Sequence, residues 1–259
     1  MVINAAGVLG KWGVSPKVLF EANVLALKHL LEACLASNIH HFIHLSSSGV
    51  SGTLGRDGAD ENHPCNPSSP YEKSKYHGEK LALEMAARFK IPLTVIRPTF
   101  TYGPGDLHHL PLFRLIKRGF FIYLGDGQAS IHPVFVDDLI EGVRLCIAHG
   151  PSSDIYIMGG EKIFTIQEVV SSLAQLLGVK QPHWHLPLHA ARFSALAFES
   201  AAKVLHFEPP LTRSRLALFT QHHGYSIAKA KKELGYQPKT KLCQGLEQTI
   251  HWYREQCHL

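Results

Sequence analysis

The segment Pro70–Lys75 reads Pro-Tyr-Glu-Lys-Ser-Lys, and the interpretation of the whole chain starts from it. If the segment is helical, Tyr71 and Lys75 lie four residues apart and share one face of the helix. A lysine ammonium beside a phenol favours the phenolate, so we expect Lys75 to lower the pKa of Tyr71 from its usual value of about 10. Such a tyrosine can exchange a proton with an alcohol or a ketone. The segment therefore predicts acid/base chemistry.

The same spacing occurs a second time, in Tyr76 and Lys80, so spacing alone does not identify the site. The two tyrosines point about 140° apart on a helix and cannot serve one site. A Tyr and a Lys at this spacing are otherwise an ordinary solvated helix face. Context favours Tyr71, because Pro70 before it fits the first turn of a helix and Ser74 directly precedes its lysine.

Length and composition suggest one large or two modest soluble domains. The chain has 259 residues, of which 45% are hydrophobic, and a formal net charge of +5. Lysine and arginine are dispersed, without the basic tract that would indicate a nucleic-acid partner. No signal peptide and no apolar run of about 18 residues is present, which argues against a transmembrane segment.

Cysteine and histidine usage indicates neither disulfides nor a metal site. The 5 cysteines are scattered and contain no Cys-x-x-Cys, a pattern typical of reduced thiols in a cytoplasmic protein. The 18 histidines form no tight ligand set with carboxylates or cysteines, so we expect surface histidines and no metal.

Strand-like and helix-like segments alternate along the chain, which predicts a parallel sheet covered by helices. The segments expected as strands are Met1–Ala6, His41–Leu45, Ile91–Ile96 and Asp154–Met158. Those expected as helices are Leu19–Ser37, Tyr71–Lys90 and a helix from Thr165, its cap, to Leu177.

Three early glycines, Gly7, Gly10 and Gly13, have the spacing of a dinucleotide-binding fingerprint. That fingerprint requires a helix that opens directly on the glycines and a ribose-reading strand about 20 residues later. Here a helix is expected from Pro16, capped by Ser15, and no such strand follows. The glycines are therefore interpreted as a loop without a phosphate-binding function.

Further segments, taken together, resemble the extended branch of the short-chain dehydrogenase/reductase superfamily, the NAD-dependent epimerase/dehydratase family. Ser46–Gly52 resembles its Ser-Ser-x-x-Val-Tyr-Gly motif, and Arg97–Gly105 resembles its Arg-Pro-x-x-x-Tyr-Gly-Pro-Gly loop. The resemblance continues through Gly125–Gly127, Val134–Asp138 and Tyr225–Pro238 and covers essentially the whole chain.

The resemblance implies a catalytic set of Ser47, Tyr71 and Lys75, with Ser48 as the neighbour that could take the place of Ser47. Tyr71 would be the general acid/base, Lys75 would lower its pKa and hold the nicotinamide ribose, and Ser47 would hydrogen-bond the reacting oxygen. The implied cofactor is NAD or NADP. The positions implied for cofactor binding are Ala5, Ala6, Gly7, Asn23, Ser46, Tyr71, Lys75, Pro98 and Thr99. Those implied for substrate binding are Val8, Ser47, Phe100 and Ile131.

The fold implied is α/β, a Rossmann-type doubly wound parallel sheet, truncated at its N-terminus, with a small C-terminal substrate subdomain. Residues 1–105 and 130–158 would form the Rossmann-type domain, and residues 106–129 and 159–259 the substrate-binding subdomain. The family's first strands and phosphate loop are expected to be missing. We therefore expect weak cofactor binding, and the choice between NAD and NADP stays open. A truncated, inactive scaffold or redox-sensing relative is the non-enzyme alternative.

Two positions favour an apolar substrate. Sugar-nucleotide enzymes of the family usually have Asn where this chain has Phe100 and Arg where it has Ile131, and Glu208–Arg213 resembles the 3β-hydroxysteroid dehydrogenase-like branch. We therefore expect oxidation or reduction of a secondary alcohol or ketone on a steroid- or isoprenoid-like molecule. The alternative is an NDP-sugar epimerase or dehydratase.

Two further surfaces carry expectations about partners. In similar proteins the helices expected at Leu19–Ser37 and Tyr71–Lys90 form a dimer interface, so the resemblance implies a homodimer. The segment His189–Phe207 is amphipathic and could be a lid or core helix, a dimer contact or a membrane contact. A lid or core helix is the interpretation favoured by the sequence.

Overall fold

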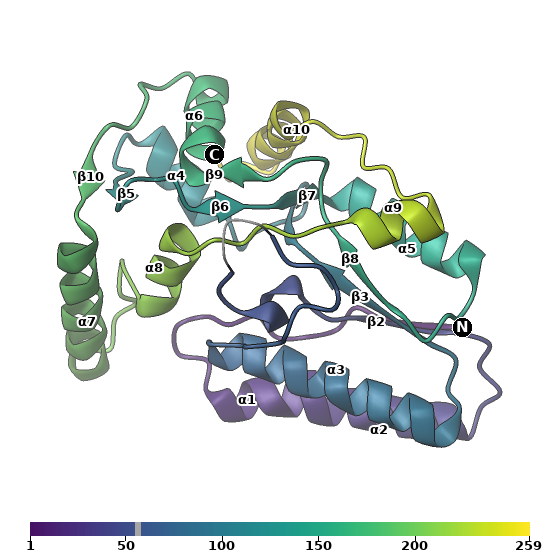
Figure 1. Cartoon of the computed structure of the whole chain (residues 1–259). Helices are drawn as coiled ribbons and strands as arrows, with labels where there is room; N and C mark the ends of the chain where they lie inside the picture. The colour runs from purple at the N-terminus through teal and green to yellow at the C-terminus, as the bar shows by residue number, and fades with distance from the viewer. Residues whose placement is uncertain (55–57) are drawn as a thin grey trace. The chain divides into compact units, whose positions relative to one another are not determined.

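Four parallel strands form the central sheet of the computed structural model, which describes residues 1–54 and 58–259. The strands β1 (Val2–Asn4), β2 (Phe42–Leu45), β3 (Leu93–Pro98) and β8 (Ile155–Met158) lie in the order β1-β2-β3-β8 (Figure 1). Side chains of β2 and β3 are buried almost without alternation, as expected for a parallel sheet covered on both faces. The predicted Rossmann-type parallel sheet is confirmed.

Two helical segments cover one face of this sheet. The chain from Pro16 to Leu35 and helix α3 (Pro70–Phe89) lie side by side below the sheet in Figure 1. Ser15 caps the first of these segments, since its Oγ accepts a hydrogen bond from the Val18 amide at 3.3 Å. The buried residues shared by these helices and strands include Leu27, Leu31, Cys34, Phe42, Ala82, Met85, Leu93 and Val95.

The helical segment 16–35 is not the single helix that the sequence predicts. It consists of α1 (Pro16–Phe20), a π-helical turn η1 (Glu21–Leu25) and α2 (Ala26–Leu35). In the π-helical turn the amide of Ala26 donates to the carbonyl of Glu21, five residues back. Such turns are rare and are often found at functional sites.

Helices α5 (Val136–His149) and α9 (Ala228–Leu234) pack against β8. Gly142 permits the close approach of α5, because a Cβ on it would lie 2.8 Å from the sulfur of Met158. The chain after α9 is tied down by Tyr236, whose hydroxyl donates to the carbonyl of Gly159 at 2.9 Å.

The chain divides into two units. Unit 1 comprises residues 1–99, 138–159 and 225–238, and unit 2 comprises residues 100–137, 160–224 and 239–259. The predicted division differs in four places: residues 100–105 and 130–137 group with unit 2, and residues 159 and 225–238 group with unit 1. Segment 225–238 groups with unit 1 because α9 and Tyr236 pack on the end of β8, a contact that the sequence pattern does not reveal.

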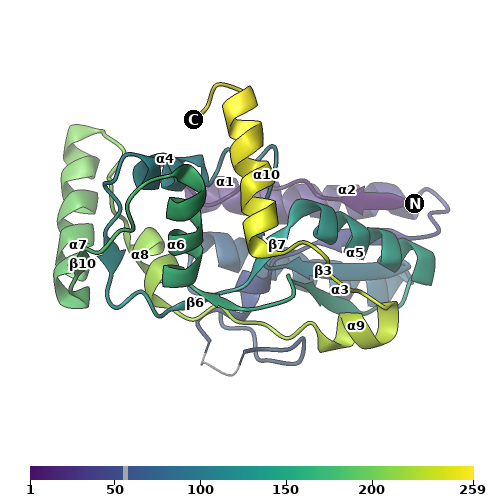
Figure 2. The same ribbon diagram turned by 90° about the horizontal axis from the view of Figure 1, so that it is seen from above.

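Unit 2 consists of short strand pairs and helices around a core of its own (Figure 2). Its strand pairs are β4 (Phe100–Tyr102) with β7 (Pro133–Phe135), β5 (Tyr123–Leu124) with β10 (His185–Leu186), and β6 (Ser130–Ile131) with β9 (Phe164–Thr165). Its helices are α4 (Leu110–Lys117), α6 (Ile166–Leu177), α7 (Leu188–Leu205), α8 (Arg213–Thr220) and α10 (Leu242–Glu255). The predicted cap of α6 is confirmed, since Thr165 Oγ1 accepts from the Glu168 amide.

The loop predicted at Gly52–Ser69 includes residues 55–57, which lie outside the described residues. Its described part folds back on itself and contacts the segment around Ser226. Gly52 has φ +73°, and a Cβ there would lie 1.9 Å from the carbonyl oxygen of Asn66. The Ser226 amide donates to the carbonyl of Ala59 at 2.8 Å. Across the described ranges, none of the helices has the length and apolar character needed to span a membrane.

Candidate active site

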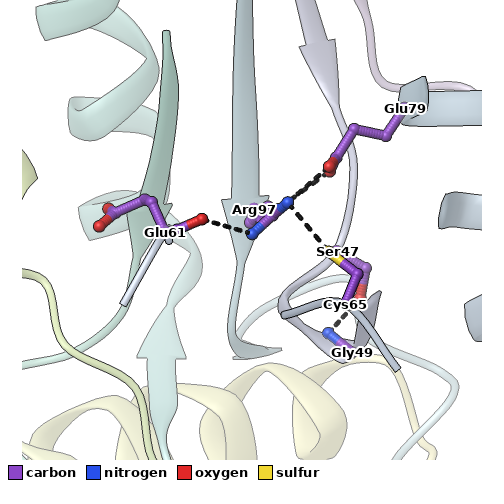
Figure 3. A network of polar contacts seen from close by, with 6 residues as sticks. All are labelled: Ser47, Gly49, Glu61, Cys65, Glu79 and Arg97. Carbon is purple, nitrogen blue, oxygen red and sulfur yellow. Dashed lines mark hydrogen bonds and ion pairs between the residues drawn. The ribbon is translucent and has the colours of Figure 1, made fainter. Parts of the chain in front are cut away.

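Ser47 is placed by the end of strand β2. The chain leaves β2 and enters a short 3₁₀ helix, η2 (Ser48–Ser51), for which Ser47 is the N-cap residue. Its Oγ accepts a hydrogen bond from the Gly49 amide at 3.1 Å, as Figure 3 shows. The capping bond fixes the Ser47 side chain at the carboxyl end of the strand, where ligands bind in sheets of this type.

Tyr71 lies in the first turn of α3, whose start is strongly specified. Ser69 and Glu72 form a reciprocal capping box, and Pro70 occupies the first turn. Burial raises the pKa of Tyr71, a hydrogen bond with Ser47 opposes that rise, and the negative charge of Glu72 adds to it. Ser47 and Tyr71 are therefore in direct contact, whereas Tyr76 contacts the His77 ring.

The expected lowering of the Tyr71 pKa by Lys75 is wrong for this structure. Nζ of Lys75 donates to the main-chain carbonyl of Leu45 at 2.7 Å, and burial of the phenol dominates the Tyr71 pKa. Lys75 is itself only 6% exposed. Burial lowers the pKa of Lys75 to about 8, although the negative charge of Glu79 works in the opposite direction.

Asn23, in the π-helical turn, connects the loop after β1 to helix α3. Its Oδ1 accepts from the Val8 amide at 2.8 Å, and its Nδ2 donates to the Val8 carbonyl at 3.0 Å and to Ser74 Oγ at 2.9 Å. Ser74 in turn donates to the carbonyl of Tyr71 at 2.7 Å. The close packing requires Gly78, because a Cβ there would lie 2.5 Å from the carbonyl oxygen of Asn23.

The loop after β1 lies close to Tyr71 and Lys75, and its role in cofactor binding stays a prediction. A Cβ on Gly7 would lie 3.0 Å from Asn23 Oδ1 and 3.9 Å from Lys75 Nζ. A Cβ on Gly10 would lie 2.8 Å from the Cβ of Tyr71. Ala5 and Ala6 precede Gly7 in this loop and are exposed. Both glycines are therefore needed for close packing, which explains their presence without a phosphate-binding role.

Two buried polar residues that the sequence did not single out support this loop. Asn4 accepts from the Ala6 amide at 3.2 Å through Oδ1, and its Nδ2 lies 3.3 Å from Nδ1 of His44. Burial, together with the charge of Lys75, lowers the pKa of His44 to about 3, so this imidazole is neutral. The alternation of β1 and β2 places both side chains on the same face of the sheet, which is the signal that could have identified them.

A buried ion pair joins strand β3 to helix α3 (Figure 3). Arg97, on β3, donates to both carboxylate oxygens of Glu79 on α3, at 2.6 and 3.0 Å, and both side chains are at most 3% exposed. Arg97 also contacts the Cys65 sulfur at 3.5 Å and the Glu61 carbonyl at 3.4 Å. The Glu61 carboxylate accepts from the Ile157 amide at 2.8 Å. All three nitrogens of the Arg97 guanidinium therefore have partners within the protein.

The remaining predicted residues fall in both units. Ser46 follows β2, Pro98 ends β3 and Thr99 follows it, all in unit 1, and Ser46 Oγ is a buried hydroxyl with no partner in the described structure. Phe100 and Ile131 lie in unit 2, where the centroid of the Phe100 ring lies 4.2 Å from that of His109, with the rings tilted by 47°, and Ile131 is a core residue with 4% exposure. Their role in substrate binding stays a prediction. No group of three or more metal-ligating side chains occurs in residues 1–54 and 58–259.

Known proteins share both the sequence pattern and the fold. A family model described as "NAD dependent epimerase/dehydratase family" matches residues 1–159. Short-chain dehydrogenase/reductase family 42E member 1 of Mus musculus is 28% identical over 281 residues, covering 99% of this chain and 70% of the relative. A dTDP-glucose 4,6-dehydratase of Streptomyces antibioticus is 28% identical, covering 93% of this chain and 65% of the relative.

Solved structures give the same result for the fold. The crystal structure of gox2253 has a TM-score of 0.82 at 27% identity and covers 100% of this chain and 79% of its own. UDP-glucuronic acid 4-epimerase from Bacillus cereus, in complex with NAD, has a TM-score of 0.78 at 24% identity and covers 98% of this chain and 74% of its own.

Proposed function

Because the chain belongs to the NAD-dependent epimerase/dehydratase family of extended short-chain dehydrogenases/reductases, we propose that it interconverts a secondary alcohol and a ketone with NAD or NADP. The observation that carries the proposal is the contact between Ser47 and Tyr71, with Lys75 one helical turn along α3. In this set a hydroxyl holds the reacting oxygen and a phenol exchanges the proton.

The proton is moved at the phenolic oxygen of Tyr71. In ketone reduction the phenol donates its proton to the substrate oxygen, and in alcohol oxidation the phenolate accepts the proton from the hydroxyl. The Ser47 hydroxyl donates a hydrogen bond to the same oxygen as negative charge develops there. The raised pKa of Tyr71 keeps it as a phenol at neutral pH, the form that donates a proton in ketone reduction.

The residues present fit the nicotinamide end of the cofactor. Lys75 uses one N–H for the Leu45 carbonyl and keeps two donors for ribose hydroxyls. Ser46 Oγ is buried without a partner among the described residues, and Gly7 leaves space beside Lys75. A bound nicotinamide supplies or accepts hydride at the carbon that carries the substrate oxygen.

We assign the substrate to the apolar class, steroid- or isoprenoid-like, on the basis of Phe100 and Ile131. Both are apolar where sugar-nucleotide enzymes of the family usually have polar groups, and neither can bind a diphosphate. The second candidate, an NDP-sugar, is supported by the dTDP-glucose dehydratase and UDP-glucuronic acid epimerase among the similar proteins. The third, a non-catalytic scaffold or redox-sensing protein, predicts no turnover of either class.

The proposal includes a homodimer formed through α1, η1 and α3. Three apolar side chains of α1 and η1 are 38–44% exposed: Val18, Phe20 and Leu25. The Phe20 ring packs edge-on against His77 of α3. Burial of these side chains against a second copy would remove them from water.

The test is turnover, followed by nicotinamide absorbance, with apolar alcohols and ketones in one arm and NDP-sugars in the other. NAD(H) and NADP(H) are supplied at millimolar concentrations. Tyr71→Phe should lower the rate by a factor on the order of 10²–10⁴, and Tyr76→Phe is the matched control on the same helix. Loss of activity in the Tyr76 variant alone would overturn the assignment of the site. Turnover restricted to an NDP-sugar would retain the site and overturn the substrate class.

A further inference from the structure

Helix α7 exposes large apolar side chains on its outer face. Phe193 and Val204 are each 74% exposed and Leu196 is 53% exposed. At 100° per residue the three lie within about 80° of one another, so they form one stripe along the helix. Arg192 and Lys203, both exposed, lie next to Leu196 at the side of the stripe. We call these five residues the α7 face.

The inner side of α7 carries small residues. Ala191, Ala195 and Ala202 are at most 3% exposed, and the first two pack in a minor cluster with Leu216 of α8. A surface helix normally turns its large apolar residues inward and its polar residues outward. In α7 that order is reversed, which the expectation of a lid or core helix does not explain. In Figures 1 and 2 the helix lies at the margin of unit 2, with its outer side free of other elements of that unit.

The charge around the α7 face has one sign. Residues 169–207 contain a single acidic residue, Glu199. Its carboxylate is buried and accepts from the Arg213 amide and Nε, both at 2.8 Å. A groove between α7 and α8 is lined by Arg192, Leu196 and Arg213, among other residues. The surface therefore combines exposed apolar groups with cations and offers no exposed carboxylate from this segment.

Further exposed apolar side chains lie directly before the two strands β5 and β10, and β10 leads into α7. Trp184 is 65% exposed, Phe120 70% and Ile122 47%. Trp184 precedes β10 and Ile122 precedes β5, and the Trp184 carbonyl accepts from the Tyr123 amide at 2.9 Å. Residues 107–125 contain no acidic residue. Tryptophan and phenylalanine beside basic residues are the side chains preferred at a lipid headgroup boundary.

We propose that the α7 face docks on the surface of a membrane that contains anionic phospholipids. The apolar stripe enters the headgroup boundary while Arg192 and Lys203 stay at the level of the phosphates, where long basic side chains reach by extending along the helix. The α7 face lies in the plane of the membrane surface. A second copy of the chain fits this surface less well, since a twofold contact would bring the basic residues of both α7 faces together. This inference is independent of the proposed function.

The experiment is co-sedimentation of the full chain with vesicles of phosphatidylcholine, with or without about 30% phosphatidylserine, at low and high salt. The wild-type chain should bind the anionic vesicles, bind neutral vesicles at least tenfold less tightly, and lose affinity as salt screens the basic residues. Phe193→Ser with Val204→Ser should lower the partition coefficient by at least about tenfold. Phe89→Ser is the matched control, because Phe89 is 43% exposed in unit 1 and lies outside the α7 face.

Three outcomes would overturn the proposal. In the first, the wild-type chain does not bind anionic vesicles. In the second, the α7 double variant, shown by circular dichroism to be folded, binds as tightly as the wild-type chain or the Phe89 control. In the third, vesicles bind nothing and the double variant abolishes a self-association detected by sedimentation equilibrium, which would assign the α7 face to a second copy of the chain.

Discussion

Replacement of Lys75 by methionine should stabilise the fold while it removes activity. Lys75 is 6% exposed, and burial lowers its pKa from 10.5 to about 8. Converted at about 1.4 kcal/mol per pKa unit, that shift means that the charged lysine costs the folded state about 3 kcal/mol at neutral pH. Methionine fills similar space without a charge.

The replacement also removes the hydrogen bond from Nζ to the Leu45 carbonyl, a loss of about 1 kcal/mol. We therefore expect Lys75→Met to raise the free energy of unfolding by about 2 kcal/mol near neutral pH. The measurement is denaturant unfolding, in which the midpoint should rise without a change of slope. Lys80→Met is the matched control: its side chain is 62% exposed on the same helix, and the change should stay within about 0.5 kcal/mol.

The pH dependence separates this explanation from simple repacking. Between the folded pKa of about 8 and the unfolded value of 10.5, the unfolded state binds more protons at Lys75 than the folded state does. Wild-type stability therefore gains from this site as pH rises through that window, and the advantage of the variant should shrink by about 2 kcal/mol between about pH 7 and pH 10. A variant that is less stable than the wild type, or one whose advantage does not change with pH, would refute the reasoning.

Three further predictions address the residues around Lys75. Burial raises the pKa of Tyr71, so its phenol should ionise only above about pH 10. The measurement is the difference between the alkaline absorbance titrations of the wild-type chain and Tyr71→Phe. A transition below about pH 8 in that difference would contradict the prediction. Glu79→Gln leaves the Arg97 charge buried without its partner and should lower the free energy of unfolding by about 3 kcal/mol. Glu84, whose side chain is 65% exposed, is the control, and Glu84→Gln should change the free energy of unfolding very little. Equal effects of the two substitutions would disprove a buried pair. Asn23→Ala frees both main-chain groups of Val8, so hydrogen exchange at the Val8 amide should accelerate more than tenfold, and unchanged protection would show that Asn23 is not needed there.

The sequence predicted most of the sheet because its strands are short, mostly apolar segments between loops and helices. The observed strands begin and end within two residues of the predicted ones, and the pairing order agrees with the family resemblance. The contact of Ser47 with Tyr71 was also predictable, since the motif specifies the strand end and the helix start that bring them together.

Two properties of the site were beyond the sequence. The direction of the Tyr71 pKa depends on how deeply the phenol is buried and on where the Lys75 ammonium points, and neither follows from a spacing of four residues. The orientation of α7 was missed because an amphipathic pattern identifies an apolar face without showing which side the protein covers.

The π-helical turn affects how this chain is compared with others. Such a turn accommodates one residue more than an α-helix of the same length, so a relative without it should align only if a one-residue gap opens near Glu21–Leu25. Deletion of Ala22 would restore regular α-helical winding, because the wide turn absorbs the extra residue without rotating the helix on either side of it. Leu19, which is 2% exposed, would therefore keep its buried position, and the Ser15 cap would stay in place. In a regular α-helix the same deletion would rotate the preceding residues by about 100°.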